Sequence, residues 1–259
     1  MSEVFRSDLF AGKVAFLAGA TSGINLAIAE RFAQLGASVF VISRSAEKVA
    51  AAVNTLREAG AKANGVAADV RSFEAVAAAM DACVAEFGAL DIVVSGAAGN
   101  FLARAADLSP NGFRTVIDID LIGSFHVLKA GYERARKPGA AMLVISALQS
   151  FRAYPSQVHA CAAKAGIDAM MKAMALEWGP EGVRVNSIAP GPIADTEGMA
   201  RLAPDPGATE RITRAIPLQR FGFKSDIAEL AVFLCSEASA NITGALVVSD
   251  GGSSLGVGR

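Results

Sequence analysis

Short runs of apolar, often β-branched residues alternate along this chain with longer segments in which apolar residues recur every three or four positions. Apolar runs at Val14 to Leu17 and Val39 to Ile42 flank an amphipathic stretch from Gly23 to Gln34, which predicts a strand, a helix and a second strand. Further strands are expected at 61–67, 92–95, 142–146, 183–188 and 246–249, and further helices from Ser72, Gly112, Gln157 and Ser225. This repeated order predicts a parallel sheet with helices on both faces.

Nothing resembling a linker or an internal repeat interrupts the 259 residues. We therefore expect one α/β domain over residues 1–259, a doubly wound sheet of about seven parallel strands. Residues 190–217 are dense in proline and glycine, which is expected to break regular structure. Because this segment follows the carboxyl end of a strand, we expect a lid over a cleft, the alternative being a loop that only joins the last two units.

The charge and cysteine content exclude several classes of protein. The chain has 24 basic and 25 acidic side chains, so no net field attracts nucleic acid. Its three cysteines are widely spaced in apolar surroundings, which predicts reduced thiols and neither a disulfide framework nor a metal site. The sequence lacks both a run of about 18 apolar residues and a signal-peptide pattern at its start. A cytoplasmic protein without a membrane segment is expected.

A glycine-rich turn, Ala18 to Asn25, lies between the first predicted strand and the first predicted helix. Backbone N–H groups at such a helix start, together with the helix dipole, can hold a pyrophosphate, as in Rossmann-type dinucleotide sites. The candidate contacts in this turn are Gly19, Thr21, Ser22, Gly23 and Ile24. Asn25 stands where a third glycine would be, so either the helix stands off the sheet or Asn25 caps the helix.

The end of the second predicted strand bears on the choice of cofactor. The segment Ile42 to Lys48 has no acid placed to hold a ribose 2′-hydroxyl, but it carries two cations, Arg44 and Lys48. This pattern favours NADP(H) over NAD(H). The alternative is that both cations are solvated residues at a helix start.

Several short motifs occur along the chain in the order that is typical of one protein family. Gly19 with Gly23, the Asp69-Val70 pair, Lys164, Asn186 and the run Pro190 to Ile193 together resemble the short-chain dehydrogenase/reductase family over nearly the whole chain. That family's ordinary catalytic set is Asn, Ser, Tyr and Lys. The corresponding positions here are Asp120, Ala147, Ala160 and Lys164, so three of the four are replaced.

Three further stretches, Ser95 to Leu102, Asp118 to Asp120 and Gln157 to Ala160, resemble the 2,4-dienoyl-CoA reductase branch, particularly its peroxisomal type, which also lacks the tyrosine. The resemblance implies NADPH-dependent reduction of 2,4-dienoyl-CoA thioesters to 3-enoyl-CoA in unsaturated fatty acid degradation, by a homotetramer. We expect no peroxisomal carboxyl-terminal signal, since the sequence reads Gly256 to Arg259 at its end.

The resemblance also implies further contacts in the site. Expected cofactor contacts are Asp69, Val70, Ala97, Ala98, Gly99, Lys164, Pro190, Gly191 and Ile193. Expected acyl-CoA contacts are Arg71, Phe101, Ser109, Pro110, Asn111 and Arg201. For the arginines the alternative is that they are ordinary surface residues.

The replacements favour a conjugated substrate. A ketone that receives hydride becomes an alkoxide and needs a nearby acid, which neither Ala147 nor Ala160 can supply. A dienoyl thioester instead spreads the charge into a dienolate, and its proton can arrive later at the α-carbon, even from water. We expect Lys164 to bind the nicotinamide ribose and to stabilise the dienolate by its charge. Asp120 lies in an apolar run, so we expect it to pair with Lys164 or a water and to orient the proton-delivering water.

Two alternatives remain open from the sequence. The chain could reduce another activated alkene or carbonyl, with Tyr154 or a substrate group as the proton donor. It could also be a catalytically silent homologue that binds NADP(H). His159 and Cys161 lie two residues apart on a predicted helix and point in roughly opposite directions, so a nucleophile–base pair is not expected.

Overall fold

The structure is a computed structural model that describes residues 4–196, 199 and 205–256. Its strands form one parallel sheet in the order β3-β2-β1-β4-β5-β6-β7. The strands are β1 (Val14–Ala18), β2 (Ser38–Ser43), β3 (Ala63–Ala67), β4 (Ile92–Ser95), β5 (Ala141–Ile145), β6 (Arg184–Pro190) and β7 (Leu246–Ser249). The order reverses between β1 and β4, and in sheets of this kind ligands bind at the carboxyl ends of the strands beside that switch point.

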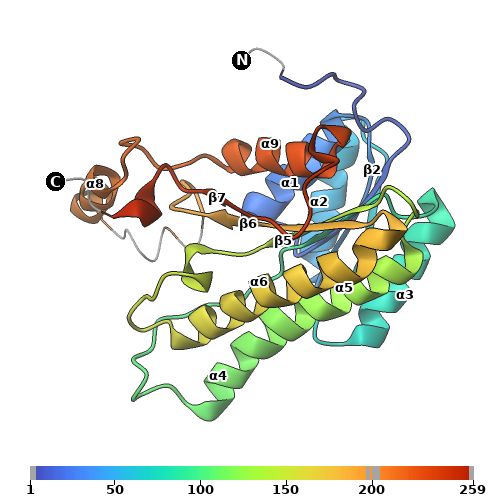
Figure 1. The fold of residues 1–259 in the computed structure, drawn as a ribbon. Helices are drawn as coiled ribbons and strands as arrows, with labels where there is room; N and C mark the ends of the chain where they lie inside the picture. Colours follow the sequence, from blue (N-terminus) through green and yellow to red (C-terminus); the bar gives the residue numbers. More distant parts are fainter. Residues whose placement is uncertain (1–3, 197–198, 200–204, 257–259) are drawn as a thin grey trace.

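Helices cover both faces of the sheet (Figure 1). One face packs against α1 (Gly23–Gln34), α2 (Ala46–Glu58) and α9 (Lys224–Cys235). The other face packs against α3 (Phe73–Phe87), α5 (Gly123–Arg134) and α6 (Val158–Trp178). Side chains of β1 alternate between the two apolar cores, with Ala15 and Leu17 on the α1 side and Phe16 on the α3 side. The predicted doubly wound architecture is confirmed.

The predicted strands all occur, with shifts of one or two residues at their ends, and the helix predicted from Gly23 to Gln34 is found with those bounds. The sequence prediction omitted α2 and α8 (Pro206–Ala215). The expectation that residues 190–217 lack regular structure is wrong for α8. Proline is tolerated in the first turn of a helix, and the Asp205 carboxylate caps α8 by accepting from the Ala208 N–H at 2.8 Å.

The long helix predicted from Gly112 is interrupted by a π-helical segment, Ile117–Ile122, between α4 (Pro110–Val116) and α5. Such π-bulges occur frequently at functional sites, because the altered winding re-aims the side chains that follow. Within this segment Asp120 is buried, whereas Asp118 is only half-buried. Asp120 is therefore the enclosed one of the two acids.

Among the described helices, none is both long and apolar enough to cross a membrane.

Candidate active site

Two adjoining hollows lie at the carboxyl ends of β1, β2, β4 and β5. The smaller, about 290 Å³, we call the Arg44 cavity, and the larger, about 620 Å³, the Lys164 cavity. Ser22, Asn25, Gly96 and Ala98 line both. The two hollows therefore form one cleft with a neck at these four residues, and each lies within or near the range that small-molecule sites occupy.

The glycine-rich turn Ala18 to Asn25, which we call the phosphate loop, approaches the segment Gly96–Gly99 closely. Gly19 has a φ of +77°, and a Cβ atom there would lie 2.7 Å from the backbone of Ala97, so only glycine fits. Ser22 precedes α1 and makes no side-chain cap bond, which leaves the first-turn N–H groups of α1 to bind an anion in the cleft.

Cations line the Arg44 cavity. Arg44 and Lys48 both face it, and within the described chain neither forms an ion pair. Asp69 also lines this cavity, but the Arg71 guanidinium bonds both of its carboxylate oxygens, at 2.5 Å for Nη2 to Oδ2. This contact lowers the pKa of Asp69 and neutralises its charge. The cavity therefore suits a phosphorylated ribose, the group that distinguishes NADP(H) from NAD(H).

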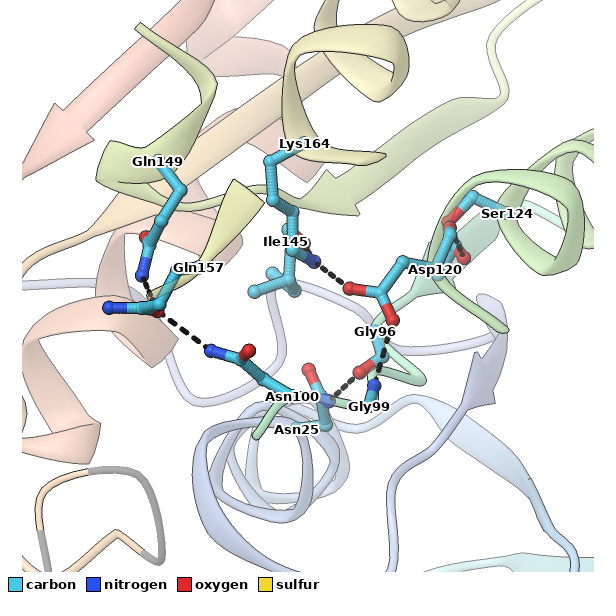
Figure 2. Close-up of polar contacts among 11 residues, drawn as sticks. Asn25, Gly96, Gly99, Asn100, Asp120, Ser124, Ile145, Gln149, Gln157 and Lys164 are labelled. Atoms are coloured by element: carbon cyan, nitrogen blue, oxygen red, sulfur yellow. Dashed lines mark hydrogen bonds and ion pairs between the residues drawn. The ribbon is translucent and has the colours of Figure 1, made fainter. Parts of the chain in front are cut away.

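Lys164 projects from α6 into the Lys164 cavity and is held from two sides (Figure 2). Its Nζ lies 3.2 Å from Asp120 Oδ2 and donates to the Ile145 carbonyl at 3.1 Å. Asp120 is 1% exposed, and its Oδ1 accepts from the Gly99 N–H at 2.7 Å. The predicted Asp120–Lys164 pair is thus present. An ammonium has three N–H donors, so one is left for a ligand.

Asn25 does not cap α1 as one of the two sequence interpretations had it. Its Nδ2 donates to the Gly96 carbonyl at 2.7 Å and to the Gly19 carbonyl at 3.4 Å. The side chain thereby joins the phosphate loop to the segment after β4.

A cluster of three amide side chains, which the sequence did not predict, joins Gln149, Gln157 and Asn100 (Figure 2). Gln157 Oε1 accepts from Asn100 Nδ2 at 2.9 Å and from Gln149 Nε2 at 3.0 Å. Gln149 also lines the Lys164 cavity. Three polar residues at 100, 149 and 157 have no shared spacing in the sequence, so no local pattern could have grouped them.

Comparisons with known proteins agree with this geometry. The family model described as enoyl-(acyl carrier protein) reductase matches residues 19–254. A Pongo abelii protein named peroxisomal 2,4-dienoyl-CoA reductase [(3E)-enoyl-CoA-producing] is 44% identical over 97% of this chain and 87% of its own. The chain belongs to the short-chain dehydrogenase/reductase family.

More distant members of the family are also similar to this chain over nearly its whole length. A Bacillus subtilis protein named probable 2,4-dienoyl-CoA reductase [(2E)-enoyl-CoA-producing] is 35% identical over 93% of this chain and 96% of its own. A solved structure of a gluconate 5-dehydrogenase from Burkholderia cenocepacia, in complex with NADP and tartrate, superposes with a TM-score of 0.88. It is 28% identical and covers 96% of this chain and 99% of that chain.

For a short-chain dehydrogenase/reductase, the site is unusual because it lacks two hydroxyl side chains that the family ordinarily has. Where the family has serine and tyrosine, this chain has Ala147, which lines the Lys164 cavity, and Ala160, which is buried. Tyr154, considered as a substitute acid, is not among the residues that line either cavity. Burial raises the pKa of Tyr154, so its hydroxyl is a weaker acid than that of an exposed tyrosine. Among the described residues that line the Lys164 cavity, Lys164 and Lys224 are the cations.

The predicted cofactor residues gather in this cleft, with one exception. The Arg44 cavity is lined by Gly19, Thr21, Ser22, Arg44, Lys48, Asp69, Val70, Ala97 and Ala98. The Lys164 cavity is lined by Ser22, Gly23, Ile24, Ala98, Lys164, Pro190, Gly191 and Ile193. Gly99 lines neither cavity and instead donates its N–H to Asp120. The sequence prediction missed Asp195, Thr196 and Lys224, which also line the Lys164 cavity.

Those of the predicted substrate residues that the structure describes, unlike most of the cofactor residues, do not line the two cavities. Phe101 is 40% exposed and stacks on the buried His159 ring, with centroids 4.5 Å apart. Ser109 accepts from the Gly112 N–H at 3.0 Å, so its hydroxyl caps α4, where Pro110 and Asn111 begin the helix at the surface. Arg71 is bound to Asp69. Arg201 lies outside the described residues.

Proposed function

We propose that the chain is an NADPH-dependent 2,4-dienoyl-CoA reductase that forms 3-enoyl-CoA thioesters. The observation that carries this proposal is the buried Lys164–Asp120 pair in a cavity where the serine and tyrosine of ordinary reductases are Ala147 and Ala160. Relatives that are 42–44% identical and named peroxisomal 2,4-dienoyl-CoA reductase support the same substrate class and the (3E) product.

NADP(H) is the cofactor that the cleft fits best. The close approach of Gly19 to Ala97 and the first turn of α1 form a cradle for the pyrophosphate, and Arg44 and Lys48 supply charge for the 2′-phosphate. The NADP complex of the Burkholderia cenocepacia neighbour supports this assignment. When bound, the reduced nicotinamide supplies the hydride.

In this proposal Lys164 provides the charge that the reaction needs. Lys164 lines the Lys164 cavity and its side chain is 9% exposed, so the field of its ammonium acts with little screening by water on the negative charge that develops in the dienolate. No residue has to deliver a proton at the moment of reduction. The absence of hydroxyl groups at positions 147 and 160 is therefore compatible with turnover of a conjugated thioester and not with that of a simple ketone.

Asp120 acts through its neighbours in this account. The sequence suggested that it orients a water molecule, but both carboxylate oxygens already accept from chain donors, Lys164 Nζ and the Gly99 N–H, and the residue is 1% exposed. We therefore propose that Asp120 is a positioning residue. It holds the Lys164 ammonium and the segment Gly96–Gly99 in fixed positions relative to each other.

An acyl-CoA is the proposed substrate, with Phe101 beside the acyl chain. The lid at 190–217, the single domain over residues 1–259 and the homotetramer remain predictions from the sequence. The cytoplasmic location also remains a prediction, since the Danio rerio and Saccharomyces cerevisiae relatives are named as peroxisomal proteins.

The test is to measure the rate of NADPH oxidation with each member of a panel of substrates. We expect turnover of 2,4-dienoyl-CoA thioesters and background rates with simple ketones. Lys164→Ala should nearly abolish turnover, and Asp120→Ala should lower kcat more than it weakens NADPH binding. Background rates with every acyl-CoA, in a protein that still binds NADPH, would instead support a catalytically silent homologue.

The cofactor assignment has its own test. Arg44→Ala with Lys48→Ala should lower kcat/KM for NADPH by about tenfold or more while leaving kcat/KM for NADH nearly unchanged, because only NADPH carries the phosphate. An equal loss with both nucleotides would contradict the phosphate role. Arg57→Ala, at the other end of α2, is the control, since its Nε donates to the Ala63 carbonyl away from the cleft.

A further inference from the structure

We propose that Asn25 is a positioning residue for the cofactor, one that fixes the segment Gly96–Gly99 against the phosphate loop and so couples the Arg44 cavity to the Lys164 cavity. This inference rests on the proposed binding of NADP(H). Asn25 stands at the neck of the cleft, where it lines both cavities.

The segment Gly96–Gly99 is held at both of its ends. At one end, the Gly96 carbonyl accepts from Asn25 Nδ2 at 2.7 Å, and at the other, the Gly99 N–H donates to Asp120 Oδ1 at 2.7 Å (Figure 2). Asp120 also pairs with Lys164. A continuous set of contacts therefore runs from α1 through this segment to the ammonium group, and Asn25 is its first member.

Asn25 and Gly96 fit each other in size. A Cβ atom on Gly96 would lie 2.2 Å from Asn25 Oδ1 and 2.4 Å from both Cγ and Nδ2. The amide therefore occupies the space that any side chain at position 96 would need. A glycine in α1 usually lets the helix approach its neighbours, and here the close approach is kept by placing the glycine on the opposite segment.

The stability of the fold does not by itself explain why position 25 carries an amide side chain. Asn25 Oδ1 is buried and has no hydrogen-bond partner within the described chain. A buried acceptor without a donor destabilises a fold, and a glycine at position 25 would avoid that cost. The reverse orientation of the amide would set its oxygen against the Gly96 and Gly19 carbonyls, so the contacts fix the orientation.

The physical effect is pre-organisation. The segment Gly96–Gly99 contains two glycines and two alanines, a composition with little side-chain packing to order it. Holding it in place before the cofactor arrives removes an ordering cost from binding. Without Asn25 the segment would be ordered only when the cofactor binds, and the affinity for the cofactor would be lower.

The first experiment compares Asn25→Gly with the wild-type protein. NADPH affinity is measured by the change in its fluorescence, and the thermal midpoint is measured without cofactor. We expect the Kd for NADPH to rise about tenfold, the factor for loss of one well-made hydrogen bond, with little change in the thermal midpoint. Gln34→Gly, in the exposed last residue of α1, removes an amide and adds a glycine away from the cleft, and should leave the Kd unchanged.

The second experiment tests the fit between positions 25 and 96. Gly96→Ala should weaken NADPH binding by more than tenfold in the wild-type background, because its methyl group overlaps the Asn25 amide. In the Asn25→Gly background the same change should have an effect of about twofold or less, because the space is then open. An equal effect of Gly96→Ala in both backgrounds would overturn the inference.

The outcomes separate this inference from the proposed function. Asn25→Gly with an unchanged Kd and a lowered thermal midpoint would make Asn25 a packing residue only and would overturn the inference alone. Failure of the wild-type protein to bind NADPH would overturn the proposed function and this inference with it.

Discussion

Replacing Lys164 by methionine gives the sharpest test of the buried ion pair. The change removes the ammonium but keeps an unbranched apolar stem. Asp120 would then keep one partner, the Gly99 N–H at 2.7 Å, and lose the Nζ atom 3.2 Å from its other oxygen. The carboxylate has almost no access to water to replace the lost charge, since Asp120 is 1% exposed.

The magnitude follows from this geometry. Removing one partner of a buried pair costs about 3–5 kcal/mol, because the other charge is left uncompensated. Since the Gly99 N–H still binds one carboxylate oxygen, we expect the lower end, about 3 kcal/mol. At about 2–4 °C per kcal/mol for a chain of this size, the thermal midpoint should fall by about 6–12 °C.

The assay is thermal and urea unfolding of Lys164→Met, Asp120→Asn and the double variant, all without cofactor. Asp120→Asn removes the remaining charge and keeps a carbonyl oxygen for the Gly99 N–H. The double variant should therefore be at least about 1 kcal/mol more stable than Lys164→Met, although it stays inactive. Stability losses that simply add in the double variant would refute the reasoning.

Two further predictions concern other parts of the chain. Arg71→Ala should raise KM for NADPH and not KM for dienoyl-CoA, because it leaves the Asp69 charge unneutralised in the Arg44 cavity. Since Arg71 lowers the pKa of Asp69, the stability of this pair is present above the ordinary aspartate pKa and should be lost as pH falls through the lowered value. Burial raises the pKa of Cys83 and of Cys235 to about 12, so at pH 8 a thiol reagent should label native protein only at Cys161 and should label all three cysteines after denaturation.

The succession of strands along the chain and the need of Asp120 for a partner could be predicted from the sequence for clear reasons. Buried parallel strands are continuous apolar runs, and a carboxylate within an apolar run must have a partner. The π-helical segment Ile117–Ile122 gave no such signal, because the same residues also fit an ordinary helix.

Patterns of neighbouring residues in the sequence could not predict contacts between segments that are far apart in the chain. Asn25 bonds to a carbonyl 71 residues away, and Asn100 and Gln157 are 57 residues apart. The sequence pointed to Asn25 as an exception to the glycine pattern, but only the position of Gly96 shows what its amide does. Arg71 was expected to contact the substrate, whereas its guanidinium bonds the Asp69 carboxylate, two residues away in the sequence.

The product formed from a 2,4-dienoyl-CoA shows whether the chain reduces a conjugated thioester as proposed. The reaction is run with NADPH deuterated at the transferred position, and the product is analysed by NMR and mass spectrometry. We expect a 3-enoyl-CoA with deuterium at C5 and, in a second reaction with ordinary NADPH in heavy water, a 3-enoyl-CoA with deuterium at C2. A 2-enoyl-CoA product, or NADPH consumption with ketones and none with dienoyl-CoA, would refute the proposed reaction.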